Sequence, residues 1–261
     1  GRRAHAPRAP LVPRRHRRAN RFATGGCLTI LMVLILVLGV FASLMWYAGW
    51  RVGQASEEND KKALASLLQQ ADRIADESGR ALRGSDPSSA EKAADVIWKH
   101  TEAPVITHDA ALGMFTAVVE KAVEYNTAGL PPGGSERTVR CLVFTYTHGP
   151  GRKWTSQVSA KDVNACRSST DIGNRARAAR SRLANMPRED LTRAGIQQAL
   201  DPAGRPDLVT VKSAIRRNGS VIVSALISSR DGAAGQCYRL TRPYEGVEIQ
   251  LSAAAAPAIT C

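Results

Sequence analysis

The stretch CLVFTYTHGPGRKWTSQVSAKDVNAC, from Cys141 to Cys166, predicts an antiparallel hairpin with a cysteine at each end. Residues 138–147 are rich in β-branched and aromatic side chains, which favour strands. The Pro and Gly of HGPGR then turn the chain, and residues 153–159 return as a second strand. The two cysteines form a disulfide, a pair of metal ligands, or a nucleophile with an unrelated neighbour, and the compartment decides between these readings.

A second cysteine pair repeats this pattern near the C-terminus. In the first copy CLVFT starts at Cys141 and QVSA precedes Cys166; in the second, CYRLT starts at Cys237 and QLSA precedes Cys261. The two cysteine separations are 25 and 24 residues. An internal duplication, with each copy running from helices into strands, would explain the echo, and chance could also supply so short an identity.

Disulfides are the expected role of these cysteines, because an even number of them lies in a region predicted to be exported. Four cysteines permit three pairings, and the equal spacing favours Cys141–Cys166 and Cys237–Cys261. Each bridge closes a loop that should stabilise the fold by roughly 3–3.5 kcal/mol. We expect no metal or cofactor, since no C-x-x-C or H-x3-H spacing is present. A reactive Cys141 would need a base, and strand alternation places His148 on the opposite face.

The residues before the hairpin show helical spacing. Apolar side chains fall on one face over 64–75, and GSDPSS then breaks the helix. Ser88 with Glu91 fits a capping box that starts a second helix. A third helix is expected over Asp109–Tyr125, with His108 and Asp109 at its N-terminus and Asp109 favoured there by the helix dipole.

After the first hairpin the chain alternates again between helix and strand. A basic helix is expected over Asp171–Leu183, and a shorter one after Pro187 ends near Leu200. Four strands follow, with Asn218-Gly219 marking the first turn: LVTVKSAI, SVIVSALIS, QCYRLT and VEIQLS, the last over 247–252. The fold class is therefore α+β, with several helices and antiparallel hairpins stapled by two disulfides.

An apolar segment precedes this region. Residues 22–50 carry no charged side chain, and CLTILMVLILVLGVFASLMWYAGW, residues 27–50, is apolar almost throughout. About 20 apolar residues in a helix span a bilayer core. Trp46, Tyr47 and Trp50 cluster at one end, where such rings favour the headgroup layer. We expect an uncleaved signal-anchor; the alternative is a signal peptide cut after Ala55, although its apolar core usually has only about 7–15 residues.

The net charge of +13 is distributed unevenly along the chain. Residues 1–26 hold eight arginines and no acid, and the remainder has 28 basic and 23 acidic side chains. Arg17, Arg18 and Arg21 precede the apolar segment and Arg51 follows it, which predicts a cytoplasmic N-terminus and an exported C-terminal region. The tail should bind anionic lipid headgroups of the bilayer, at about 1 kcal/mol per residue. Nucleic acid is not the expected partner, because aromatic residues do not alternate with the arginines.

Four parts are expected, the last two either separate or forming one domain. They are a disordered basic cytoplasmic tail (1–26), a transmembrane helix (27–50), a membrane-proximal helical region (51–130) and a disulfide-stapled α+β region (131–261). The Ala- and Arg-rich composition is typical of GC-rich bacteria, so the membrane is taken to be a bacterial plasma membrane.

Function is less well defined by the sequence. No nucleophile elbow, zinc-protease or phosphate-loop motif is present. We expect a non-enzymatic protein whose exported domain binds an envelope protein or polymer. The candidate anion-binding residues are Arg175, Arg177, Arg180 and Arg182, for which a solvated helix face is the plainer reading. The alternatives are a tethered hydrolase that uses His100, His108 or His148, and a ligand-sensing domain.

Overall fold

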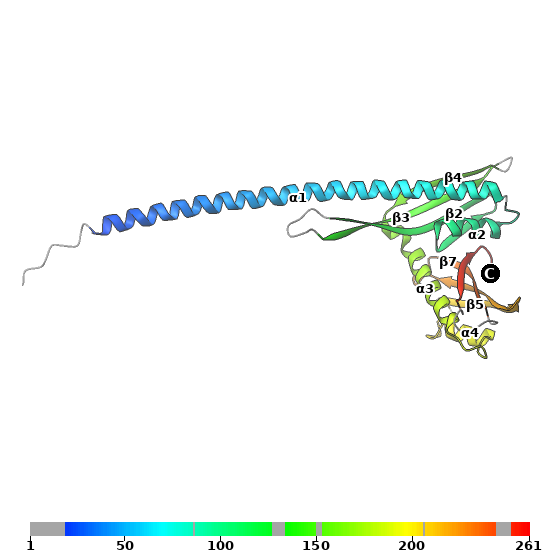
Figure 1. Ribbon diagram of the computed structural model, residues 1–261. Helices are drawn as coiled ribbons and strands as arrows, with labels where there is room; N and C mark the ends of the chain where they lie inside the picture. The colour runs from blue at the N-terminus through cyan, green and yellow to red at the C-terminus, as the bar shows by residue number, and fades with distance from the viewer. Residues whose placement is uncertain (1–18, 86, 127–133, 150–152, 206, 244–251) are drawn as a thin grey trace, which may run out of the picture. The chain divides into compact units, whose positions relative to one another are not determined.

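The computed structural model describes residues 19–85, 87–126, 134–149, 153–205, 207–243 and 252–261. Its contacts form two units, and α1 contributes to both, with the division after Glu57. The second unit consists of Glu58–Asn126 and Gly134–Cys261. The protein is a mixed fold of helices and antiparallel sheets, with two bonded cysteine pairs and one long apolar helix near the N-terminus (Figure 1).

Helix α1 (Ala19–Ser85) runs without interruption through the apolar segment. From Thr29 it is long and apolar enough to cross a membrane, a property that a signal sequence near the N-terminus shares. Its large apolar side chains from Ile30 to Trp50 are exposed in this unit. At the end of this segment the Tyr47 and Trp50 rings lie 6.3 Å apart, and the Arg51 guanidinium lies 5.5 Å from the centre of the Tyr47 ring.

The second unit contains two successive halves. The first half, residues 58–166 without 127–133, has the end of α1, a second helix and a four-stranded antiparallel sheet in the order β1-β2-β3-β4. Its remaining elements are α2 (Ala90–Thr101), β1 (Val105–Asp109), β2 (Met114–Asn126), β3 (Ser135–His148), β4 (Trp154–Lys161) and the 3-10 turn η1 (Val163–Cys166). Ala71, Ala75 and Leu82 of α1 are buried in the same core cluster as Phe144 and Tyr146, which occupy alternate positions of β3.

The second half, residues 167–261, repeats this order. Two helices precede a four-stranded antiparallel sheet in the order β5-β6-β7-β8. The elements are α3 (Arg167–Ala184), α4 (Arg193–Leu200), β5 (Val209–Arg217), β6 (Ser220–Ser228), β7 (Gly235–Pro243) and β8 (Ala254–Ala258). The expected Asn218-Gly219 turn joins β5 to β6, and both residues have positive φ, as a tight primed turn requires.

The expected disulfides are confirmed. Cys141 bonds Cys166 and Cys237 bonds Cys261, and each bridge joins the third strand of its sheet to the residues just beyond the fourth. The structure thus has the helices-then-strands order in each half that the sequence echo predicts.

Three local predictions are wrong. Residues 109–125 do not form a helix: Asp109 ends β1, residues 110–113 turn the chain, and the rest lies in β2, where Phe115, Ala117 and Val119 alternate into the core and the strand pairs with β1 and β3. Asp109 does not start a helix: its carboxylate accepts the Ala111 and Leu112 amides in the turn before β2.

The N-cap of α2 is Ser89 and not Ser88, since the Ser89 hydroxyl accepts the Lys92 amide. Glu91 therefore caps nothing and instead accepts the amides of Ile259 and Thr260. The strand expected over 247–252 lies outside the described residues apart from Ser252, which is not in a strand, and the fourth strand is β8.

Each half contributes an apolar residue to the core of the other half. Val105 of β1 belongs to the core of the second half, and Ile259 after β8 packs against the core of the first half. The halves therefore bury part of their apolar surface only when they are joined, and the second unit should unfold as one cooperative body.

Candidate functional site

The contact between the halves is built from β7. Gln236 is buried. Its side-chain Oε1 accepts a hydrogen bond from the Ile106 amide at 2.9 Å, and its Nε2 donates to the Ala258 carbonyl at 2.6 Å. The Tyr238 hydroxyl donates to the Pro104 carbonyl at 2.6 Å. Because buried polar groups are costly without partners, these bonds define how the halves meet.

An interhalf groove of about 500 Å³ lies beside this contact. Its basic side chains come from three elements and are Lys121 of β2, Arg137 of β3, and Arg177 and Arg180 of α3. Gly173 allows α3 to approach the first half closely, since a Cβ there would lie only 2.9 Å from the Pro104 Cβ. Trp98 of α2 adds an aromatic wall.

The two acids that line the groove are already engaged. Glu102 accepts from the Lys121 ammonium at 3.2 Å, and Glu120 accepts from the Thr170 hydroxyl at 3.0 Å. Arg137 and Arg180 are exposed, and their side chains have no partner within the described part of the chain. The groove can therefore offer two guanidinium groups, each able to bind a carboxylate or phosphate in bidentate geometry.

The four arginines predicted to bind anions fall into two pairs. Arg177 and Arg180 line the interhalf groove. Arg175 instead pairs with Asp171 at 3.3 Å, and Arg182 donates to the Leu200 carbonyl at 2.8 Å. The same helix therefore supplies two residues to the candidate site and two to internal contacts.

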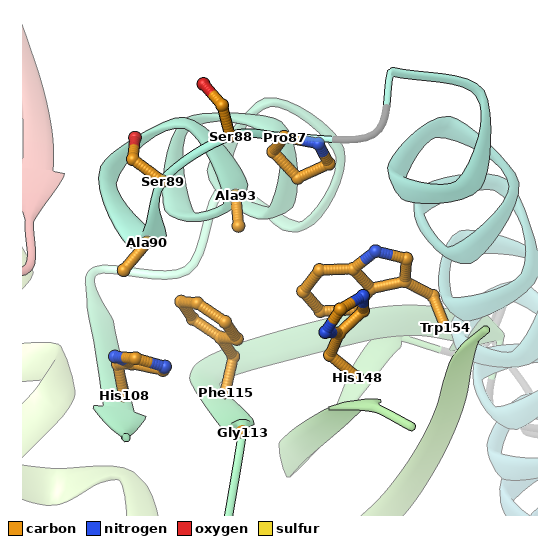
Figure 2. A pocket seen from close by; sticks show the side chains of 10 residues that line it. All are labelled: Pro87, Ser88, Ser89, Ala90, Ala93, His108, Gly113, Phe115, His148 and Trp154. Carbon is orange, nitrogen blue, oxygen red and sulfur yellow. The ribbon is translucent and has the colours of Figure 1, made fainter. Parts of the chain in front are cut away.

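A second cavity, the aromatic pocket, has a volume of about 400 Å³ and lies at the end of the first sheet (Figure 2). Its walls are His108, Phe115, His148 and Trp154, under Ser88, Ser89 and the first turn of α2. The rings are close: His108 stacks on Phe115 at 4.2 Å, and His148 lies 4.8 Å from Trp154. Gly113 makes the preceding turn with φ of 58°, a conformation that favours glycine.

The histidines proposed for hydrolysis divide between two places. His108 and His148 line the aromatic pocket, while His100 lies in the last turn of α2. Two serines share the pocket with them, but the described lining contains no carboxylate to orient a histidine. The four cysteines of the second unit are bonded, and within the described residues no three His, Cys, Asp or Glu side chains are placed to hold a metal ion.

Of the residues predicted to meet the membrane interface, Trp46, Tyr47, Trp50 and Arg51 lie in α1 and Arg21 in its first turn. Arg17 and Arg18 lie outside the described residues. The sequence did not point to Lys121 or Arg137, because both lie in strands whose pairing brings them to the groove.

No family model, curated protein or solved structure matches the chain. The features of the chain that point to a function are therefore the apolar helix, the interhalf groove and the aromatic pocket.

Proposed function

We propose that the protein is a single-pass, signal-anchored protein of the plasma membrane whose exported second unit binds an anionic envelope component without catalysing a reaction. The interhalf groove carries this proposal. Lys121, Arg137, Arg177 and Arg180 converge there from three elements, and the acids beside them are already engaged. The described lining has four basic and two acidic side chains, and a cleft with an excess of positive charge concentrates anionic ligands.

The membrane part of the proposal is supported by two features of the chain. The apolar side chains of α1 between Ile30 and Trp50 are exposed, and a lipid environment would cover them. The two disulfides suit an oxidising compartment, which supports an exported second unit. The arginine-rich tail then stays in the cytoplasm, against anionic lipid headgroups.

Protease protection in intact cells tests this topology. Protease added outside intact cells should cut the second unit, and the mass of the membrane-extracted chain should include residues 1–55. A mature chain that starts after Ala55 would replace the anchor with a cleaved signal peptide.

Binding to model polyanions tests the groove. The full chain in neutral-lipid nanodiscs should bind labelled poly-L-glutamate, and affinity should fall as salt rises from about 50 to about 500 mM. Arg177→Gln with Arg180→Gln should weaken binding about tenfold and at most about thirtyfold, since each lost ion pair at an exposed site contributes about 1 kcal/mol or less.

A matched control comes from the same helix. Arg175→Gln with Arg182→Gln removes the same charge outside the groove and should leave the affinity within about twofold, because only screened long-range attraction changes. Equal loss in both double variants would mean that nonspecific charge carries binding, and the groove would be rejected. Polyphosphate in parallel shows whether the preferred partner carries carboxylates, as an acidic protein segment does, or phosphates, as an envelope polymer does.

A membrane-tethered hydrolase remains the second candidate, because Ser88, Ser89, His108 and His148 line one pocket. An ester substrate that the chain cleaves, with turnover abolished in the triple variant of His100, His108 and His148 to Ala, would establish it. We expect no such turnover, since no carboxylate orients either pocket histidine within the described lining.

A further inference from the structure

The interhalf groove is not lined by charged side chains alone. Its apolar lining residues come from both halves and are Trp98, Pro104, Val119, Ala176 and Ala255. Val119 belongs to the core of the first half, and Ala176 belongs to the core of the second. Trp98 packs against the first core and Ala255 against the second, and both are only partly buried. Apolar surface of both halves therefore lies in the wall of a basic groove.

Trp98 supplies an aromatic ring to this apolar surface. Packing against the first core accounts for the buried part of the ring, and the ring also lines the groove. Tryptophan is among the residues that most often dominate the binding energy of protein interfaces. An aromatic side chain on the ligand would cover Trp98 and add ring–ring attraction to the gain from apolar burial.

The basic side chains of the groove are spread over three elements. Lys121 lies on β2, Arg137 on β3, and Arg177 and Arg180 lie about one turn apart on α3. A phospholipid with one headgroup charge would meet only part of this set, and a polyphosphate chain would leave the apolar lining uncovered. A protein segment carries several carboxylates and an apolar side chain in one short stretch, so it matches both parts of the lining.

We propose that the interhalf groove binds an acidic protein segment that carries an aromatic side chain among its acidic residues. The carboxylates pair with the arginines of β3 and α3, and the aromatic side chain covers Trp98. A groove of about 500 Å³ has the size of a small-molecule site, so it holds only a short stretch of the partner. This inference rests on the proposed function, because it names the anionic partner of the same groove.

Two labelled synthetic peptides of equal length and charge test this proposal. One alternates Glu and Gly, and in the other a central Gly is replaced by Phe. Each is titrated into the full chain in neutral-lipid nanodiscs, and fluorescence anisotropy reports binding. The Phe peptide should bind about tenfold more tightly, as expected when roughly half of a Phe side chain is buried. Added salt should weaken both peptides and preserve their affinity ratio, because screening acts on charges and not on apolar contacts.

Variants of the chain locate the two parts of the recognition. Trp98→Ala should lower the affinity ratio from about tenfold to about twofold or less and leave the Glu-Gly peptide within about twofold of its affinity for the unaltered chain. Arg177→Gln with Arg180→Gln should weaken both peptides and preserve the ratio. Ile215→Ala is the control, because Ile215 of β5 is 51% exposed and is not among the described lining residues, so the ratio should stay unchanged. Far-UV circular dichroism shows whether each variant is folded.

The comparison of the two peptides on the unaltered chain decides the proposal even if Trp98→Ala does not fold. Equal affinities would overturn this inference and leave anion binding by the groove in place. If neither peptide nor poly-L-glutamate binds, the proposed function itself fails. Tighter binding of polyphosphate or of dihexanoyl-phosphatidylglycerol than of the Phe peptide would make the partner a polymer or a lipid, which overturns the inference. An unchanged ratio in folded Trp98→Ala overturns it as well, because the Phe ring would then bind outside the groove.

Discussion

The two halves of the second unit share one topology but treat the same core position differently. Five residues beyond its first cysteine, the first half has Tyr146 and the second half has Arg242, each on the core face of the third strand. Tyr146 is fully buried, and its hydroxyl lies 2.7 Å from the Ser78 hydroxyl of α1. Arg242 is 2% exposed, and its Nε and Nη1 have no partner among the described residues.

Burial acts on these two side chains in opposite directions. It raises the pKa of Tyr146 to about 12, although the hydrogen bond between Tyr146 and Ser78 opposes the rise. Burial also lowers the pKa of Arg242, and the charge of Arg188 lowers it further. A neutral hydroxyl suits the interior, whereas a cation there is destabilising. The comparison teaches that the apolar core and the disulfide are common to both halves, whereas this polar position differs between them.

Removing the disulfides should cause the largest loss of unfolding free energy in either half. Cys141→Ser with Cys166→Ser opens a loop of 25 residues, and Cys237→Ser with Cys261→Ser opens one of 24 residues. Each double variant should lose about 3 kcal/mol of unfolding free energy, measured by guanidinium titration. A loss more than about twofold larger in one half would show that the two bridges are not equivalent, since loop entropy depends only weakly on length.

At the position just before the first cysteine of each half, the two halves differ in the contacts that the side chain makes. Gln236→Leu leaves the Ile106 amide and the Ala258 carbonyl without their partner and should cost about 2–3 kcal/mol. Arg140 lies one residue before Cys141, as Gln236 lies one residue before Cys237, and the hydrogen bond that it makes within the described part of the chain is to the neighbouring Val139 carbonyl. Arg140→Leu should therefore change stability by less than about 0.5 kcal/mol. Equal effects in a guanidinium titration would mean that Gln236 does not join the halves.

Much of this fold could be predicted from residue patterns that act locally. The cysteine spacing predicted both disulfides, and Asn218-Gly219 predicted the β5–β6 turn, because each signal depends on nearby residues alone. Strand β2 was missed because Phe115 and Val119, four residues apart, fit a helical face as well as alternate strand positions. Strand β8 was missed because AAAPA has no strand signal, and its extended form depends on pairing with β7.

The candidate site shows the same division between local and long-range information. Arg177 and Arg180 share one face of a predictable helix, so they could be proposed from the sequence. Lys121 and Arg137 join them only because β2 and β3 meet α3 across the contact between the halves. That contact depends on Gln236 and Tyr238, whose partners lie 130 and 134 residues away in the sequence. No local pattern encodes such a distance.

Arg242→Met should change the unfolding free energy in the opposite direction from the preceding variants, by stabilising the protein. A methionine of similar length removes the buried charge beside Arg188 and its unsatisfied nitrogens, and it keeps most of the packing. Unfolding free energy should rise by about 2 kcal/mol, since apolar replacements of buried charges are often stabilising. Destabilisation in a urea titration would instead show that the guanidinium is paired in the folded protein.

The smallest effect concerns pH, and it has the same direction in both halves. The folded-state pKa of Tyr146 is raised above its ordinary value of 10.0 to about 12, so the folded state keeps its proton where the unfolded chain loses it. The stability that this proton contributes is complete below pH 10 and is lost as pH rises from about 10 through about 12. Tyr146→Phe should remove about 1.4 kcal/mol of the loss seen by pH 11. In the second half, Tyr238 also has a pKa raised by burial, and Tyr238→Phe should reduce the loss at this pH in the same direction. Urea titrations at pH 8 and pH 11 measure how much each tyrosine contributes to the loss of unfolding free energy. If the unfolding free energy of a Phe variant falls as steeply with pH as that of the parent chain, the replaced tyrosine ionises as freely in the folded protein as in the unfolded one.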